Sequence, residues 1–137
     1  MFDGDTGTNG AQTPAYAKDL YKSGLAAAAN FNAANPKFLG VYGMEWGTIS
    51  GGGHLNILNS KELLGWEYNA KGELLADTFT EKNNAAKLYS LMAQRGWLGQ
   101  FNHPASNGQY LVNGTAFGYT ADGEQAMALC EVVNTPA

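Results

Sequence analysis

A mainly apolar segment at residues 38–46 limits the possible folds of this chain more than any other part of the sequence. Its apolar side chains do not alternate with polar ones, which is typical of an inner parallel strand that is covered on both faces. Residues 54–58, 97–102 and 126–133 are further apolar segments of strand length. The sequence therefore predicts four strands in a largely parallel sheet.

Two helices are predicted from their end signals. Thr13 and Pro14 suit the N-cap and the first turn of a helix over residues 14–34, which an Asn-Pro pair then ends. A second helix is predicted over residues 81–95, with an apolar stripe on one face and Gly96 at its C-terminal end. Both signals depend only on local sequence.

The order of these segments is that of an α/β fold, with mostly parallel strands and at least two helices. No linker divides the chain, so we expect residues 1–137 to form a single domain. Residues 105–123 form a long polar segment dotted with aromatic side chains. Loops of such length in compact domains are often functional.

Composition and charge exclude several classes of protein. Eight basic and twelve acidic residues give a formal net charge of −4, and no Lys/Arg cluster indicates nucleic-acid binding. The single cysteine, Cys130, excludes an internal disulfide bond. The chain shows neither a signal peptide nor an apolar segment of about 20 residues that could span a membrane. Localisation stays open, since a longer parent protein could be secreted or periplasmic.

The candidate metal ligands are few and lie close to the predicted strands. The chain has only two histidines, His54 and His103, and Glu45 lies near the end of the first predicted strand. A carboxylate and two imidazoles form the mixed oxygen and nitrogen set that suits Zn²⁺, Mn²⁺ or Fe²⁺ better than Mg²⁺. Glu45, His54 and His103 are therefore the predicted ligands of a divalent metal ion. No serine nucleophile with a supporting histidine is evident.

Four motifs, taken together, resemble those of a known family. The motifs are Gly43-Met-Glu45-Trp, Gly53-His54-Leu-Asn-Ile-Leu, Gly99-Gln-Phe-Asn-His103-Pro and Glu131-Val-Val-Asn134. In order and spacing they resemble the PHP (polymerase and histidinol phosphatase) family of metal-dependent phosphoesterases, and are nearest to its CehA/McbA-like branch. The resemblance is good over residues 38–134 and weak over residues 1–37.

The resemblance implies a β/α barrel in which a metal cluster at the strand ends activates water to attack a phosphate ester. It implies that Glu45, His54 and His103 are metal ligands and that the substrate is a small-molecule or sugar phosphate ester. Trp46 and Asn102 are then candidate substrate-binding residues, as is Asn134. No residue is assigned a catalytic role beyond metal binding.

The family's opening His-x-His and closing Asp-x-His motifs fall outside residues 1–137. We therefore expect the middle part of a PHP domain, folded as a partial, open β/α barrel. A parent protein would be a metal-dependent hydrolase, whereas this chain by itself could be inactive. Too few helices are predicted to cover the strands, so self-association is also expected.

A second interpretation belongs to another class of function. A non-catalytic α/β domain could bind a glycan or a protein partner through the aromatic side chains of residues 105–123. The three tryptophans, Trp46, Trp66 and Trp97, could add a sugar-binding surface, or they could belong to the core. Metal-independent binding without turnover would favour this interpretation.

Overall fold

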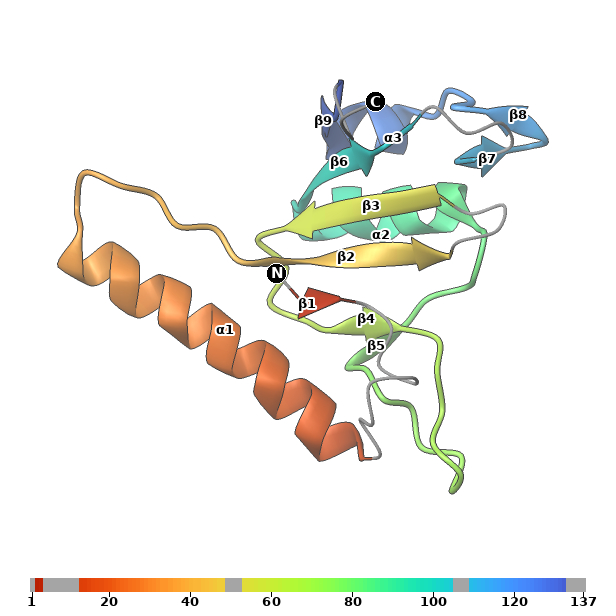
Figure 1. Ribbon diagram of the computed structural model, residues 1–137. Coiled ribbons are helices and arrows are strands. Elements are labelled where there is room, and N and C mark those ends of the chain that lie inside the picture. Colours follow the sequence, from red (N-terminus) through yellow and green to blue (C-terminus); the bar gives the residue numbers. More distant parts are fainter. Residues whose placement is uncertain (1, 4–12, 49–52, 105–108, 133–137) are drawn as a thin grey trace, which may run out of the picture.

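The computed structural model describes residues 2–3, 13–48, 53–104 and 109–132. Its centre is a five-stranded sheet with the strand order β1-β2-β3-β6-β9 (Figure 1). The strands are β1 (Phe2–Asp3), β2 (Gly43–Thr48), β3 (Gly53–Leu58), β6 (Leu98–Asn102) and β9 (Met127–Cys130). Three helices accompany this sheet in the described part of the chain.

The directions of the central strands overturn the predicted fold class. β2 pairs antiparallel with β3, and β3 pairs antiparallel with β6, while the pairs β1–β2 and β6–β9 at the two edges are parallel. The described residues form no closed barrel, so the prediction of a partial β/α barrel with mostly parallel strands is wrong. Residues 49–52 alone separate β2 from β3. Parallel neighbours need a crossover of about a dozen residues, so this connection allows only an antiparallel pair.

The apolar segment at residues 38–46 also differs from its prediction. The strand begins only at Gly43, and within it Met44 and Trp46 are buried while Glu45 between them is partly exposed. Phe38 and Leu39 precede the strand and are 71% and 82% exposed. The strand therefore has one apolar and one polar face, as is usual in antiparallel sheets.

The apolar face of the sheet packs against α2 (Ala85–Arg95). Its buried side chains join those of the helix in one core, which includes Met44, Leu55, Ile57, Leu88 and Met92. Asn84 is the N-cap of α2, and its side-chain oxygen accepts a hydrogen bond from the Lys87 backbone N–H. This helix therefore starts later than the predicted residue 81, and it ends at Gly96 in the left-handed conformation, as predicted.

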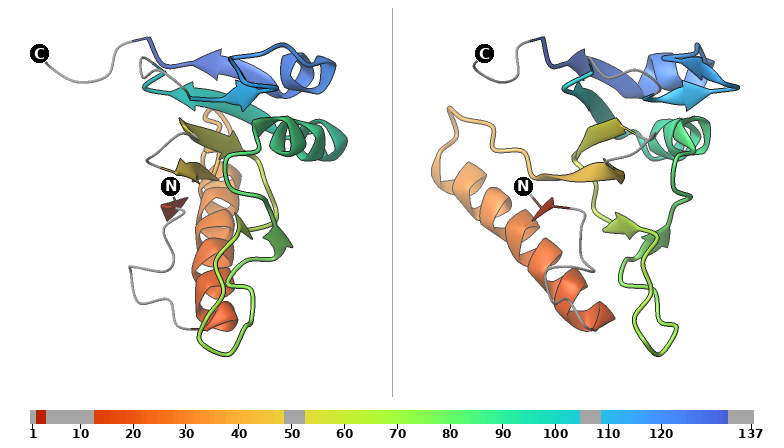
Figure 2. Two further views of the ribbon diagram at one scale, coloured as in Figure 1. Left: turned by 90° about the vertical axis from the view of Figure 1, so that its right-hand side faces the viewer. Right: turned by 45° about the vertical axis from the view of Figure 1, so that its right-hand side comes forward.

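The first helix, α1 (Pro14–Ala34), has the predicted boundaries. Thr13 is its N-cap and Asn35 its C-cap. Only Ala17 and Tyr21 are buried along its length, and the Tyr21 hydroxyl donates a hydrogen bond to the Ser60 carbonyl oxygen. Figure 2 shows this helix apart from the other two. None of the described helices is long and apolar enough to cross a lipid bilayer.

The segment predicted as a long loop contains regular structure. β7 (Leu111–Val112) and β8 (Thr115–Ala116) form a small hairpin, and α3 (Ala121–Ala126) follows, with Thr120 as its N-cap. Residues 105–108 of this segment lie outside the described residues. A further pair of short parallel strands, β4 (Leu64–Gly65) and β5 (Thr78–Phe79), precedes α2.

The raised pKa values of two buried tyrosines predict how the free energy of unfolding depends on pH. Burial raises the pKa of Tyr89 above its usual value and raises the pKa of Tyr110 to about 12. Above about pH 10 the unfolded chain releases phenolic protons that the folded chain retains, so the free energy of unfolding should fall as the pH rises. Urea denaturation at pH 8 and pH 11 measures this change. Because Tyr89→Phe removes one of these phenols, the fall should be smaller in that variant, and an equal fall would contradict the prediction.

Candidate metal centre

Polar side chains gather on the face of the sheet opposite the core. In β2 this face carries Glu45, in β3 His54 and Asn56, and in β6 Gln100 and Asn102. The strand register places Asn56 beside both Glu45 and Gln100, and places His54 beside Asn102. Because side chains in a strand alternate between faces, these positions form one continuous polar surface.

The three predicted ligands meet on this surface. The Glu45 Oε1 atom lies 3.4 Å from His54 Nδ1 and 3.8 Å from His103 Nε2. The two imidazole rings lie edge to face, with centroids 4.9 Å apart. One ligand atom from each of the three side chains lies within 4.8 Å of the other two. The fold therefore brings together residues that are far apart in the chain.

The two separations from Glu45 are compatible with a shared metal ion. Nitrogen and oxygen ligands bind zinc at about 2.0–2.2 Å, so two ligands of one ion lie at most about 4.3 Å apart. Both distances from Glu45 fall inside that limit. The side chains of Glu45, His54 and His103 are 32%, 27% and 38% exposed. A metal ion bound by these side chains would therefore be accessible from solvent.

A glycine opposite His54 leaves space for its ring. Gly47 pairs directly with His54 across the β2–β3 ladder. A Cβ atom at Gly47 would lie 2.7 Å from His54 Cδ2 and 2.2 Å from the Gly53 carbonyl oxygen, which is too close for any side chain. Gly47 therefore keeps the polar face open where the imidazole lies.

Buried amides orient the Glu45 carboxylate. The Asn102 Nδ2 group donates hydrogen bonds to Glu45 Oε1 and to Asn56 Oδ1, both at 2.9 Å. Gln100 Nε2 donates in turn to Asn102 Oδ1 at 3.1 Å. Asn102 and Asn56 are only 6% and 8% exposed. Such outer hydrogen bonds direct a metal-binding carboxylate and limit its motion.

The carboxylate of Glu131, which directly follows β9, holds His103. The His103 backbone N–H donates to Glu131 Oε2 at 2.6 Å, and the Glu131 N–H donates to the Phe101 carbonyl oxygen at 2.9 Å. His103 has a φ of 33°, which is uncommon for a residue other than glycine. Glu131 therefore stabilises an unfavourable backbone conformation that directs the imidazole toward Glu45.

Tyr110 joins β3, which carries His54, to β6, which ends just before His103. Its side chain is fully buried, and its hydroxyl lies 2.7 Å from the carbonyl oxygens of both His54 and Asn102. A Cβ atom at Gly53 would overlap the Tyr110 ring, so glycine is needed at that position. Tyr110 therefore links the start of β3 to the end of β6 beneath the metal-binding face.

The other predicted site residues have different positions. Trp46 is 1% exposed on the core face, where its indole N–H donates to Thr80 Oγ1, so it lies away from the Glu45 carboxylate. Asn102 borders the cluster but is buried, so it is placed to orient Glu45 rather than to meet a substrate. Asn134 lies outside the described residues.

Sequence reasoning missed four supporting residues. Asn56 and Gln100 could have been found, because each lies two positions from a predicted site residue in a strand and so shares its face. Glu131 belonged to the fourth motif but was assigned no role, and Tyr110 carried no comparable signal. Each reaches the site through contacts between distant segments.

Comparison with known proteins found no match to this chain among family models, curated proteins or solved structures. The resemblance to the PHP family therefore stays a prediction.

The buried hydroxyl of Tyr110 predicts a measurable contribution to stability. Tyr110→Phe leaves a buried carbonyl oxygen without its donor, so the free energy of unfolding should fall by about 1–3 kcal/mol. Urea denaturation at neutral pH measures this change. The control is Tyr16→Phe, since Tyr16 is 58% exposed and its loss should change stability by less than about 0.5 kcal/mol. Equal stability of the two variants would show that the hydroxyl contributes nothing.

Proposed function

We propose that this chain binds a divalent transition-metal ion through Glu45, His54 and His103 and belongs to a metal-dependent phosphoesterase. The observation that supports this proposal is the cluster itself, in which the chain's only two histidines lie beside one partly exposed carboxylate. Zn²⁺ or Mn²⁺ suits the mixed donor set best, and Fe²⁺ is a further candidate. The substrate class is a small-molecule or sugar phosphate ester.

The charge of the cluster favours an anionic substrate. Glu45 supplies one negative charge, and the imidazoles bind metal in their neutral form. A divalent ion and its three ligands alone would carry a net charge of about +1, which attracts a phosphate group, and the Glu131 carboxylate beside His103 offsets part of this charge. When bound, such an ion polarises a phosphoryl oxygen and lowers the pKa of a water molecule toward neutrality.

Side chains of the protein orient the Glu45 carboxylate and leave one side of the cluster open. Asn102 holds the Glu45 carboxylate through its 2.9 Å hydrogen bond, so this carboxylate does not need to reorganise when a ligand arrives. The exposed edges of His54 and His103 leave one side of the cluster open to solvent. A phosphate ester would approach from that side, because the other side is the sheet itself.

Binding through the aromatic segment is the second candidate function. Phe117 and Tyr119, which belong to the segment first considered for a glycan or a protein partner, line a pocket. Its wall includes Phe101, which alternates in β6 with Gln100 and Asn102 and so lies on the other face of the sheet. The metal centre and this pocket can therefore be tested separately.

Metal titration tests the first half of the proposal. Isothermal titration calorimetry of the metal-free chain with ZnCl₂ or MnCl₂ should show one site per chain. Loss of an outer hydrogen bond typically costs about 10–100-fold in affinity, so loss of a ligand in Glu45→Gln or His54→Ala should cost at least as much. Glu73→Gln makes the same chemical change at an exposed carboxylate and should bind like the wild type. Equal affinity in all four proteins would overturn the site.

Turnover tests the second half. p-Nitrophenyl phosphate and bis(p-nitrophenyl) phosphate probe monoesters and diesters, and hydrolysis of one of them should require added metal and be lost in Glu45→Gln. Metal binding without turnover of either ester would reject the phosphoesterase function for this chain while leaving the metal site intact.

The hydrogen bond from His103 to Glu131 makes a separate prediction. Glu131→Ala removes the acceptor that holds the His103 backbone, so metal affinity should fall by about 10–100-fold. Glu131→Gln keeps an oxygen that can accept this bond and should retain most of the affinity. Calorimetry compares the two variants. Equal losses would show that the negative charge, rather than the hydrogen bond, is what matters.

A further inference from the structure

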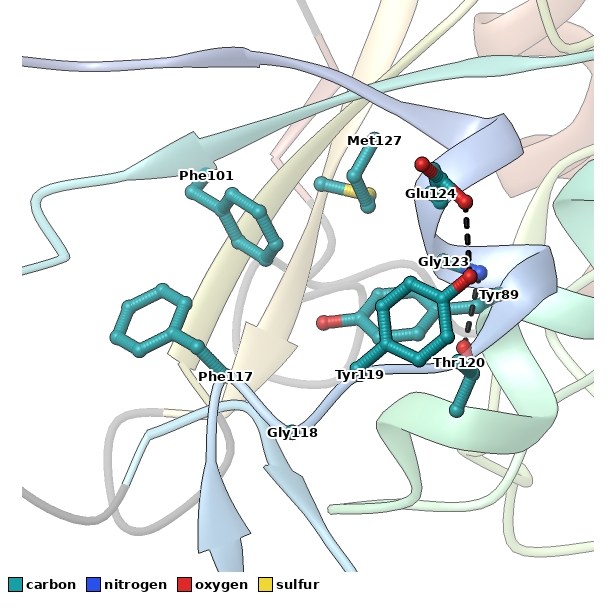
Figure 3. Close-up of a pocket in the computed structure, with 9 residues that line it drawn as sticks. All are labelled: Tyr89, Phe101, Phe117, Gly118, Tyr119, Thr120, Gly123, Glu124 and Met127. Carbon is teal, nitrogen blue, oxygen red and sulfur yellow. Dashed lines mark hydrogen bonds between the residues drawn. The ribbon is translucent and has the colours of Figure 1, made fainter.

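A pocket of about 210 Å³ lies on the core side of the sheet, between β6, the segment that follows β8, and α3 (Figure 3). Aromatic rings and one thioether form most of its walls. These side chains are Tyr89, Phe101, Phe117, Tyr119 and Met127. Phe101 lies edge-on to Tyr89 and to Phe117, with interplanar angles of 88° and 75°. The walls are therefore apolar and are built from several separate elements.

The hydroxyl group of Tyr89 is the unusual feature of this pocket. Tyr89 is 2% exposed, yet its hydroxyl has no hydrogen-bond partner among the described residues. Figure 3 shows this hydroxyl directed toward the rings of Phe101 and Phe117. A buried unpaired hydroxyl costs about 1–3 kcal/mol, and folded proteins rarely leave one without a partner. A ligand with an acceptor atom would supply the missing partner.

Polar groups at the rim are already paired with one another. The Tyr119 hydroxyl donates to the Glu124 carboxylate at 2.8 Å, and Thr120 Oγ1 accepts from the Gly123 backbone N–H at 2.9 Å. Burial also raises the pKa of Tyr89, so its phenol keeps its proton and remains a donor over the physiological range. Within the buried part of the pocket, the Tyr89 hydroxyl is therefore the donor left without a partner among the described residues.

The apolar walls and the unpaired Tyr89 hydroxyl indicate which class of ligand the pocket could bind. A sugar would bring several hydroxyl groups against mostly apolar walls, and each hydroxyl left unpaired there would cost free energy. An anion would meet the Glu124 carboxylate at the rim. Aromatic walls favour another flat ring, which can lie edge-on to them.

We propose that this pocket binds a small, neutral aromatic compound carrying one hydrogen-bond acceptor, which accepts the hydroxyl hydrogen of Tyr89. The site lies across the sheet from Glu45, so the proposal does not depend on the metal centre. Under this proposal the aromatic segment at residues 105–123 binds a small aromatic molecule and not a glycan.

Acetophenone is a suitable probe, since it is a neutral aromatic ring with a single carbonyl acceptor. Titration into the full chain, followed by ¹H–¹⁵N correlation spectra, should give saturable shifts at Phe101, Phe117 and Met127. Tyr89→Phe removes only the unpaired hydroxyl, so the variant should fold, bind metal normally and bind acetophenone about 3- to 10-fold more weakly. Tyr16→Phe, at an exposed position, is the matched control and should bind like the wild type.

Two further probes distinguish the ligand classes. Benzoate tests the exclusion of anions, and methyl α-glucopyranoside tests the glycan alternative; both should bind more weakly than acetophenone. Tighter binding of the glucoside, no saturable binding of acetophenone to the wild type, or equal acetophenone affinity in Tyr89→Phe would each overturn the proposal. Thermal melts of every variant verify that a loss of binding is not a loss of folding.

Discussion

The antiparallel pairing of β2 with β3 and of β3 with β6 gives the sheet an apolar face that packs in the core and a polar face that carries the metal-binding side chains. Met44 and Trp46 enter the core, and Glu45 between them projects to the polar face. A register slip of one residue would reverse these positions and bury a carboxylate in the core, at a large cost in desolvation. The hydrophobic core therefore holds the register, and the register in turn places Glu45 beside the two histidines.

Around the metal centre the protein uses buried polar groups, which contribute to stability only when each is paired. Asn102 donates hydrogen bonds to both Asn56 and Glu45 and so directs the Glu45 carboxylate. Tyr110 and Glu131 act on the backbone instead, at the two segments that carry the histidines. The same contacts that hold the strands together thus position the ligands. By contrast, the Tyr89 hydroxyl in the aromatic pocket stays unpaired, which is why that pocket suggests a ligand.

Local signals predicted part of the fold. The boundaries of α1 follow from Thr13 and Pro14, whose effects act within one helical turn. The direction of β2 relative to β3 was predicted wrongly, because a run of apolar residues was given more weight than the short connection after Thr48. α3 was missed because a helix of six residues is too short to show a periodic apolar pattern.

By itself the sequence determined the ends of α1, the end of α2 and the small set of residues able to bind a transition metal, since only two histidines are available. Only the tertiary structure decided which of the nearby side chains face that set. It placed Trp46 in the core and brought Tyr110 and Glu131 to the site. The physical reason is that caps and turns are contacts between neighbours in the chain, whereas strand pairing and burial join residues whose separation in sequence carries no local signal.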